Sequence, residues 1–303
     1  MNVIITGYSG FVGTNLSSHL ANQDVHVFAV SLRNDEWKNK IDENSDAIIH
    51  LAGKAHDTSD VSDPEEYYKI NRDLTIELFN EFLNSDIKKF FYFSSVKAAA
   101  DTVDGILTED VDENPVTHYG KSKIEAEKYI LSKNLPEGKN VYIIRPCMIH
   151  GPGNKGNLNL LYKVVEKGIP WPLATFENKR SFLSIDNLNF LIHQMLKKDL
   201  PSGIYNFADD KAISTNELIS TINIALNKKA KLWKISKGLI ERMASFGDKL
   251  HLPLNTERLK KLTESYVVSN QKIKSALGVE KLPLSAEEGL IKTIKSFKKL
   301  NKN

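Results

Sequence analysis

The sequence has little cysteine, no long apolar run and little net charge, and each shortage excludes a class of protein. Cys147 is the single cysteine, which excludes an intrachain disulfide framework and a cysteine-based metal cluster. No stretch reaches the ~18 uninterrupted apolar residues that cross a membrane, so we expect no membrane partner. The net charge of +3 comes from interspersed bases and acids, which argues against nucleic acid as the main partner.

Metal-ligand patterns and an export signal are also lacking. His118 and His150 have no partner at a metal-binding spacing, so we predict no metal site. Met1 leads directly into an apolar strand pattern at residues 3–6 rather than into a signal peptide. Together with the single cysteine, this pattern predicts a protein of the reducing cytoplasm.

Apolar residues make up 41% of the 303 positions, enough to fill one large α/β unit or two small domains. The first half alternates short apolar runs with segments of helical periodicity. The expected strands, each buried on both faces, are residues 3–6, 25–30, 47–51, 90–94 and 141–145. The expected helices between them are residues 11–21, 67–83 and 119–133. This alternation predicts an α/β fold, a Rossmann-like doubly wound parallel sheet, with its ligand at the carboxyl ends of the strands.

The second half follows a different pattern, in which Ser214 and Glu217 have the spacing of a capping box. No linker separates the halves, so we expect a smaller, discontinuous C-terminal substrate lobe packed on the sheet domain. The expected elements are helices at residues 157–168, 188–200, 214–227, 236–251 and 285–300 and a strand at residues 204–207. The predicted NADP-binding Rossmann domain comprises residues 1–155 and 181–208, and the predicted nucleotide-sugar lobe comprises residues 156–180 and 209–303.

Residues 235–250 form an amphipathic pattern that raises the question of a membrane contact. Its apolar side chains on one side of the expected helix are Leu239, Ile240, Met243, Ala244 and Phe246. Such stripes pack against a protein core far more often than against lipid. We therefore expect this one to be buried within the substrate lobe.

A glycine-rich turn follows the first expected strand, with the spacing G-x-x-G-x-x-G. Gly7 permits a sharp turn, Gly10 lets the backbone approach a pyrophosphate, and Gly13 lets the next helix pack closely on the sheet. The anion would then meet the positive end of that helix. The predicted cofactor site here comprises Gly7, Ser9, Gly10, Phe11, Val12 and Gly13.

The end of the second strand distinguishes between the two nicotinamide cofactors. An NAD site usually places an acidic residue there to hold the ribose 2′-hydroxyl. This chain has Ser31 instead, and Arg33 follows. A hydroxyl and a guanidinium suit a 2′-phosphate. We therefore predict NADP(H) as the preferred cofactor, with NAD(H) as the alternative.

Tyr119 and Lys123 lie four residues apart, on one face of the third expected helix. We expect the Lys123 ammonium to lower the pKa of the Tyr119 phenol from its ordinary value of ~10. Ser95 follows the fourth strand at the same rim, where its hydroxyl could hold a substrate oxygen while Tyr119 transfers a proton. This constellation predicts hydride chemistry at a carbonyl or an alcohol.

The chain resembles the extended short-chain dehydrogenase/reductases, the NAD-dependent epimerase/dehydratase family. The residues that carry the resemblance are the glycine-rich turn, Ile49-His50-Leu51-Ala52-Gly53, Asn71, Ser94-Ser95, Tyr119 with Lys123, Arg145-Pro146 and Gly151-Pro152-Gly153. The resemblance implies that Ser95, Tyr119 and Lys123 are the catalytic triad and that Lys123 also binds the nicotinamide ribose. It further implies cofactor contacts from Leu51, Ala52, Gly53, Asn71, Tyr119 and Pro146.

Three shorter segments are similar to bacterial reductases of UDP-linked 4-keto-6-deoxy-N-acetylhexosamines, which act in surface-polysaccharide precursor synthesis. The segments are Phe93-Ser94-Ser95-Val96-Lys97, Gly151 to Asn157, and Asn178-Lys179-Arg180-Ser181 with the following Asp186-Asn187-Leu188. This similarity implies that Asn157 and Arg180 hold the UDP moiety of the substrate, alongside Ser95 at the sugar. One departure concerns Ala99-Ala100, where many epimerases carry Tyr-Gly, and it weakens a transfer of epimerase activity.

The sequence thus predicts an NADP-dependent reductase of the 4-keto group of a UDP-linked 6-deoxy-N-acetylhexosamine. The first alternative is a UDP-hexose 4-epimerase, which would use the same triad and retain NAD. A non-catalytic NADP-sensing regulator is the alternative from another class, and the intact triad disfavours it. By analogy we expect a homodimer in which residues 64–83 and 119–133 pair with their copies as a four-helix bundle.

Overall fold

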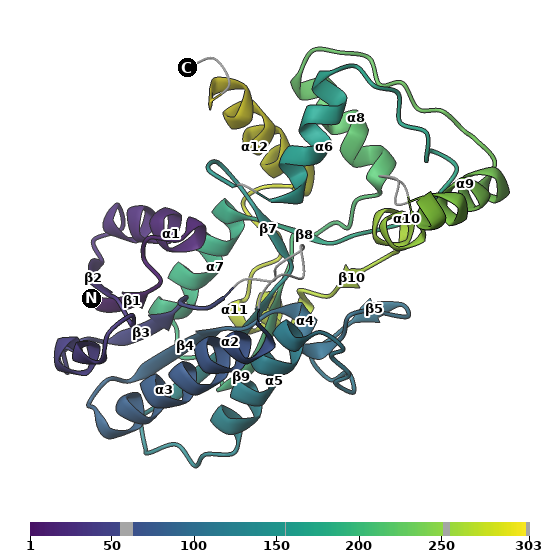
Figure 1. The fold of residues 1–303 in the computed structure, drawn as a ribbon. Coiled ribbons are helices and arrows are strands. Elements are labelled where there is room, and N and C mark those ends of the chain that lie inside the picture. The colour runs from purple at the N-terminus through teal and green to yellow at the C-terminus, as the bar shows by residue number, and fades with distance from the viewer. Residues whose placement is uncertain (55–62, 155, 251–254, 301–303) are drawn as a thin grey trace.

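The computed structural model describes residues 1–54, 63–154, 156–250 and 255–300 of the protein (Figure 1). Its larger lobe is built on a six-stranded sheet in the order β2-β1-β3-β4-β6-β9, with every pair parallel. The strands are β1 (Asn2–Thr6), β2 (His26–Val30), β3 (Ala47–His50), β4 (Lys89–Phe93), β6 (Asn140–Pro146) and β9 (Gly203–Phe207). The predicted parallel α/β sheet is confirmed.

Helices cover both faces of this sheet. On one face α1 (Phe11–Ala21) lies beside α7 (Ile185–Lys197), and both pack on alternate strand residues such as Val3 and Ile5. On the other face α3 (Leu74–Asn84) and α5 (His118–Leu131) pack on the intervening residues, such as Ile4. Each inner strand therefore buries its side chains on both faces of the sheet in alternation, which explains why these strands have continuous apolar sequences.

Strand β2 departs from the expected burial on both faces. His26, Phe28 and Ala29 are exposed, because β2 is the edge of the sheet. After β2 the chain forms only a short 3₁₀ helix, η1 (Asp35–Lys40), before it returns to β3 on the far side of β1. An apolar run has the same composition at the edge of a sheet as at its centre, so the sequence pattern did not distinguish the two positions.

The second expected helix consists of three parts. Asp63 caps α2 (Pro64–Tyr68), and a π-helical turn (Lys69–Asp73) joins α2 to α3. Pro64 fits at the first helical position, where its missing N–H would have had no partner. The π turn contains Asn71, one of the predicted cofactor contacts, and such turns often occur at functional sites.

The smaller lobe is a helical cluster around a separate apolar core. Its helices are α6 (Asn157–Glu166), α8 (Thr215–Ala225), α9 (Lys237–Leu250), α10 (Thr256–Thr263) and α12 (Ala286–Leu300). Ser214 caps α8, and Glu217 completes the predicted capping box in both directions. Figure 1 shows this lobe above the sheet, with α9 at its outer end.

The chain crosses between the lobes more often than the sequence suggested. Two short parallel pairs join distant segments: β5 (Ile106–Leu107) with β10 (Val267–Val268), and β7 (Met148–His150) with β8 (Phe182–Ser184). Helix α11 (Gln271–Leu277) lies against β9, and Ile273 and Leu277 belong to the core of the sheet. We therefore propose that residues 266–282 belong with the sheet domain rather than with the smaller lobe.

Helix α9 is only partly buried, contrary to the expectation that its whole apolar stripe packs in the lobe. Ile240 and Ala244 are buried, whereas Leu239, Met243 and Phe246 are exposed. The helix therefore has one packed apolar side and one that faces outward. Across the part of the chain that is described, no helix is long and apolar enough to span a membrane.

Candidate active site

Ser95 and Tyr119 lie together at the carboxyl ends of the strands. Ser95 follows β4 and caps the short helix α4 (Val96–Ala99), with its hydroxyl oxygen accepting the Lys97 N–H at 3.1 Å. Thr117 caps α5 by accepting the Gly120 N–H at 3.1 Å, which sets Tyr119 in the first turn of that helix. The Tyr119 and Ser95 hydroxyls are hydrogen-bonded to each other. The structure thus joins two of the three predicted catalytic residues.

Lys123 lies one helical turn further along α5 and is buried. Its ammonium donates to the Phe93 carbonyl at 2.9 Å and stands 5.0 Å from the centre of the Tyr92 ring. Burial lowers the pKa of Lys123 to about 8, against an opposing effect of the Glu127 carboxylate. The amino group therefore changes its charge close to physiological pH.

The pKa of Tyr119 differs from the prediction. Burial raises the pKa of the phenol above its ordinary value, although the hydrogen bond with Ser95 acts in the lowering direction. Burial thus outweighs the lowering that was expected from Lys123, whose ammonium donates to the Phe93 carbonyl. Tyr119 is therefore a protonated phenol at neutral pH.

Tyr67 is a further residue of the site that the sequence pattern did not reveal. Its buried ring meets the Tyr119 ring edge-on, with centroids 6.2 Å apart and planes at 71°. The Lys54 ammonium lies 5.4 Å from the centre of the Tyr67 ring and pairs with Glu66. Tyr67 comes from α2, so only the tertiary packing of α2 on α5 brings it to Tyr119.

Asn71 fixes the loop that follows β3. Its side-chain oxygen accepts the Lys54 N–H at 2.8 Å, and its amide donates to the Lys54 carbonyl at 3.1 Å and to Ser122 at 3.2 Å. These bonds tie the loop after Gly53 to helix α5. Asn71 thus shapes the wall of the site, and a cofactor contact from it stays a prediction.

The glycine-rich turn forms a cradle that larger side chains would fill. Gly7 has φ +70°, and a Cβ there would lie 2.6 Å from the Ala52 nitrogen. A Cβ on Gly13 would lie 2.3 Å from the Gly7 carbonyl oxygen. Gly10 caps α1 without any side-chain hydrogen bond, which leaves the first N–H groups of the helix to other partners. These residues fit a dinucleotide pyrophosphate.

The other predicted cofactor residues surround this cradle. Among them, Ser9 is exposed and Phe11 and Val12 are partly buried in the first turn of α1. Leu51 and Ala52 are partly buried after β3, whereas Pro146 is buried at the end of β6. The remaining predicted contacts are Gly53, Ser31 and Arg33. A Cβ added to Gly53 would lie 3.2 Å from the Lys123 Nζ. Ser31 and Arg33 are exposed in the segment that follows β2.

A buried charge cluster lies directly behind the triad. Glu127 and Arg145 are both fully buried and joined by an ion pair at 2.5 Å, and Arg145 also reaches Glu113 at 2.6 Å. The Ser94 hydroxyl donates to Glu127. Glu127 therefore links the residue before Ser95 to the helix turn after Lys123. Its spacing from Lys123, again four residues, was the signal that could have identified it.

The predicted substrate residues lie on the second lobe. The Arg180 guanidinium donates to the Lys261 carbonyl at 2.6 Å, and its backbone N–H donates to the Ile213 carbonyl. Burial lowers the pKa of Lys97, two residues after Ser95, and the nearby Arg180 charge acts in the same direction. Lys97 also donates to the Asp101 carbonyl at 2.7 Å, so these two cations lie close to the segment that follows Ser95. Asn157 begins α6, but its side chain lies outside the described part of the chain.

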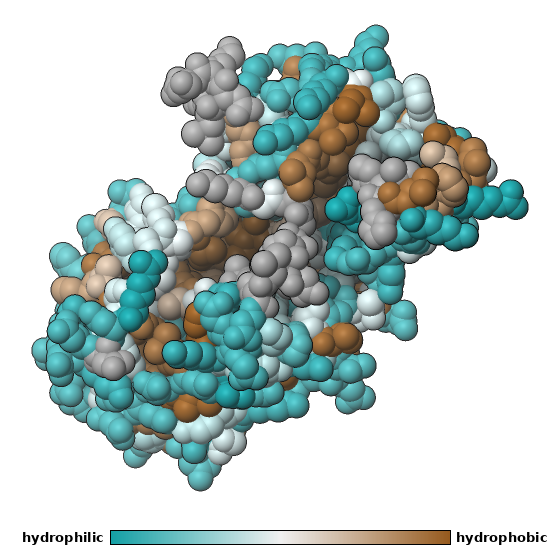
Figure 2. Space-filling model, in the orientation of Figure 1, coloured by the Kyte–Doolittle hydropathy of each residue, from teal (hydrophilic) through white to brown (hydrophobic). Residues whose placement is uncertain are grey.

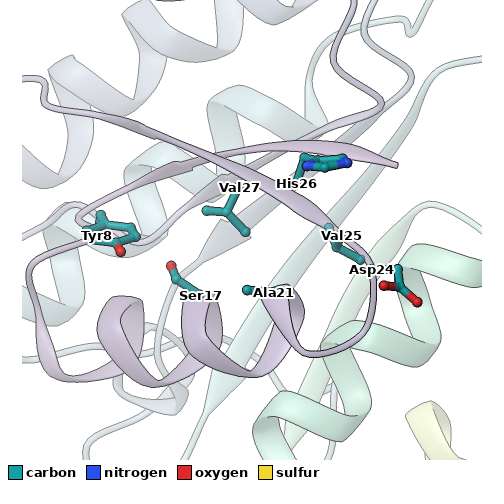
Figure 3. A pocket seen from close by; sticks show the side chains of 7 residues that line it. All are labelled: Tyr8, Ser17, Ala21, Asp24, Val25, His26 and Val27. Atoms are coloured by element: carbon teal, nitrogen blue, oxygen red, sulfur yellow. The ribbon is translucent and has the colours of Figure 1, made fainter.

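A separate groove runs between α1 and the edge strand β2 (Figure 3). Its lining residues are Tyr8, Ser17, Ala21, Asp24, Val25, His26 and Val27. It contains none of the triad, and most of its lining comes from the end of α1 and the start of β2. The predicted triad therefore lies outside this groove, which shares Tyr8 with the glycine-rich turn.

The cradle leads to a prediction about Gly13. Gly13→Ala should abolish most cofactor binding and lower the free energy of unfolding by about 1–3 kcal/mol, because the added methyl overlaps the Gly7 carbonyl. Cofactor titration and thermal unfolding measure the two effects. Gly238→Ala in α9 is the control, since its Cβ meets nothing within 4 Å. Equal cofactor affinity in both variants would contradict the proposed cradle.

Comparisons with known proteins agree with this geometry. The family model described as NAD dependent epimerase/dehydratase family matches residues 3–208. A UDP-glucose 4-epimerase from Vibrio cholerae is 30% identical over 99% of this chain and 96% of the relative. An N-acetyl-alpha-D-glucosaminyl-diphospho-ditrans,octacis-undecaprenol 4-epimerase from Escherichia coli O157:H7 is 29% identical over 75% of this chain and 73% of the relative.

Solved structures share the fold across the whole chain. MoeE5 in complex with UDP-glucuronic acid and NAD has a TM-score of 0.75 and 20% identity, covering 99% of this chain and all of that one. RMD from Pseudomonas aeruginosa complexed with NADPH has a TM-score of 0.74 and 20% identity, covering 97% of this chain and 98% of that one. At this level of identity the similarity establishes the fold alone.

Proposed function

Because the chain belongs to the NAD dependent epimerase/dehydratase family, we propose that it reduces the 4-keto group of a UDP-linked 6-deoxy-N-acetylhexosamine with NADP(H), in surface-polysaccharide precursor synthesis. The observation that carries this proposal is the convergence of Ser95, Tyr119 and Lys123 at the strand ends beside the glycine cradle. Relatives that include nucleotide-sugar epimerases and reductases support the class of reaction.

Each residue of the triad has a chemical role in this proposal. The Ser95 hydroxyl orients the substrate carbonyl by hydrogen bonding to its oxygen, and the Tyr119 phenol gives that oxygen its proton. A nicotinamide bound at the cradle would supply the hydride for the carbonyl carbon. Lys123 lies within reach of Gly53, where its ammonium would hold the ribose hydroxyls of the cofactor. Leu51, Ala52 and Pro146 would line the rest of the cofactor site.

Burial raises the pKa of the Tyr119 phenol, so the phenol carries the proton that a donor to the substrate oxygen requires. An epimerase would use the same group twice, first as a base that takes the proton of a sugar hydroxyl and then as an acid that returns it. The protonated phenol therefore fits the proposed reduction and does not by itself distinguish it from epimerisation.

Cofactor preference is a testable part of the proposal. Ser31 and Arg33 are exposed beyond β2, where they could reach a 2′-phosphate. Arg33→Ala should weaken NADPH binding by about 1.5–3 kcal/mol, the typical cost of losing a charge-assisted contact, and should change NADH binding little. Calorimetric titration of both cofactors measures this, with Lys40→Ala as an exposed control. Equal affinity of the parent protein for NADH and NADPH would contradict the assignment.

The substrate diphosphate would lie at the two cations near the triad. Arg180 can form bidentate bonds with phosphate oxygens, and Lys97 would add a second positive charge. Asn157 stays a proposed contact. Arg180→Ala should raise KM for the sugar nucleotide while kcat changes less, because the contact exists in the ground state and the transition state alike. A KM equal to that of the control variant Lys179→Ala would exclude this role.

A UDP-hexose 4-epimerase is the second candidate, and the relative from Vibrio cholerae favours it. It would use the same triad and hold its NAD tightly through each cycle. The relative from Escherichia coli O157:H7 extends this candidate to polyprenol-linked N-acetylhexosamines. The two candidates differ in a simple way, because only the reductase consumes NADPH. Incubation with NADPH and a UDP-4-keto-6-deoxy sugar should oxidise one NADPH per product formed.

The homodimer through residues 64–83 and 119–133 stays a prediction. The outer surface of these helices carries charged groups, including Arg72 paired with Asp73 at 2.6 Å and with Glu125 at 2.8 Å. A bundle formed there would have a polar interface. Light scattering of the purified protein would determine its mass in solution.

A further inference from the structure

A strip of exposed apolar side chains runs along the outer side of α9 and the loop before it. Its members, here called the α9 stripe, are Leu232, Trp233, Leu239, Met243, Phe246 and Leu250. The four on the helix are 52–59% exposed, although side chains of this size are usually buried. Figure 2 shows the resulting hydrophobic surface at α9, on the outer end of the second lobe.

The stripe is separate from the face by which α9 packs on its lobe. Residues 239, 243, 246 and 250 follow the helical spacing i, i+4, i+7 and i+11, which places them on one narrow face. The buried residues Ile240, Ala244 and Gly247 lie roughly 100° further around the helix, given 3.6 residues per turn. The stripe is therefore not needed to hold the helix in place.

The charges around the stripe are arranged asymmetrically. Arg242 and Lys249 lie on the flank of α9 next to the stripe, whereas Glu241 and Asp248 lie on the opposite side of the helix. The segment from residue 228 to 250 carries seven basic and two acidic residues, a net charge of +5. Within the described residues, none of the seven basic side chains forms an ion pair with an acidic one.

A basic hollow continues this charge beyond the helix. It lies between α6 and α8, and its lining includes Lys228, Lys229 and Lys231 beside the exposed Ile169. These lysines precede Trp233 in the loop that leads into α9. The apolar stripe thus has positive charge along the helix flank and at its N-terminal approach.

We propose that the α9 stripe is a docking surface for an anionic lipid bilayer. An outward apolar helix face with flanking basic residues and an exposed tryptophan has the composition of helices that lie in the membrane interface. A second copy of the chain is a poorer occupant, because a symmetric contact would place one +5 segment against another. The proposal is independent of the sugar substrate, because the stripe lies outside the site of the triad.

Trp233 provides a direct probe of this docking. It is 56% exposed, whereas Trp37 and Trp171 are 1% and 7% exposed, so a change in tryptophan emission on adding lipid reports mainly Trp233. Vesicles of phosphatidylglycerol and phosphatidylcholine should shift the emission to shorter wavelength and sediment the full-length protein. Vesicles of phosphatidylcholine alone should bind at least about tenfold less protein, and added salt should weaken the binding to anionic vesicles.

Paired variants separate the stripe from general surface effects. Met243→Glu combined with Phe246→Glu should lower the partition coefficient on anionic vesicles by at least about tenfold. Arg242→Glu combined with Lys249→Glu should lower it similarly without changing the apolar face. The controls are Ile106→Glu on β5, at an isoleucine that is 63% exposed, and Lys40→Glu combined with Lys88→Glu. Both should bind as the parent does, and unchanged thermal unfolding should accompany each variant.

Three results would overturn the proposal. The first is an absence of binding to anionic vesicles at low salt. The second is binding that the two α9 variants leave unchanged. The third is a loss of dimer mass in light scattering when Met243 and Phe246 are replaced, which would identify the stripe as a contact between copies of the chain.

Discussion

Replacement of Tyr119 by phenylalanine should lower turnover by at least about 100-fold, the amount expected when general acid catalysis is lost. The ring is kept, so its edge-on packing against Tyr67 persists. Only the hydroxyl that meets Ser95 and would give its proton to the substrate is removed. Steady-state kinetics measure the fall, and NADPH titration should give an unchanged affinity.

Tyr129→Phe provides the matched control for this variant. Tyr129 lies on the same helix, and its hydroxyl donates to Asn80 at 2.9 Å, away from the triad. The free energy of unfolding of that variant should fall by only ~1 kcal/mol, the contribution of one hydrogen bond, and its turnover should stay the same. Near-normal turnover of Tyr119→Phe would rule out the proposed proton donor, and a loss of NADPH binding would place Tyr119 in the cofactor site instead.

Glu127→Gln should lower the free energy of unfolding by about 3–5 kcal/mol, because it leaves the buried Arg145 guanidinium with one of its two carboxylate partners missing. Denaturant unfolding measures this change. Glu125→Gln, two residues earlier on the same helix, is the control. Its carboxylate forms an exposed ion pair with Arg72, so its loss should cost less than about 1 kcal/mol.

The pH profile distinguishes positioning by Glu127 from a structural role alone. The Glu127 carboxylate raises the pKa of Lys123, which burial has lowered to about 8. Without that carboxylate the Lys123 ammonium should lose its proton at lower pH. The alkaline limb of kcat/KM should therefore move to lower pH in Glu127→Gln and stay in place in Glu125→Gln. If the alkaline limb of kcat/KM keeps its position in Glu127→Gln, Glu127 has a structural role alone.

The sequence predicted the order of strands and helices because apolar periodicity is a local property. Helix α1 was predicted with its observed bounds, and the capping box of α8 identified its start. The burial of β2 was predicted wrongly, because the neighbours of a strand are set by the path of the chain. The segment after β2 forms the short helix η1 and then returns to β3 on the other side of β1, so β2 stays at the edge of the sheet.

The candidate site also contains residues that the sequence reveals and residues that it does not. Tyr119 and Lys123 could be paired from the sequence, because helical spacing places them on one face. Gly13 could be identified because it belongs to the glycine pattern of the turn after β1. Tyr67 could not be found, since it reaches Tyr119 through packing between α2 and α5. The pKa of Tyr119 was predicted in the wrong direction, because burial of the phenol raises the pKa and that burial depends on tertiary packing such as the contact of Tyr67 with Tyr119.

Helix α9 illustrates a limit of amphipathicity as a signal. The sequence pattern grouped Leu239 and Ile240 on one apolar side, and such sides usually pack on a core. The structure divides them, with Ile240 buried and Leu239 exposed. One helix can thus have an inner and an outer apolar face, and only the position of the neighbouring helices determines which residues belong to each.

Incubation of the purified protein with UDP-N-acetylgalactosamine or UDP-galactose, without added reductant, separates the reductase from the epimerase. A reductase exchanges its cofactor in every cycle, so it should contain little bound nucleotide and should leave both sugars unchanged. It should consume NADPH only when a UDP-4-keto-6-deoxy sugar is supplied. Sustained interconversion of either sugar with its 4-epimer would contradict the reductase account and establish the epimerase.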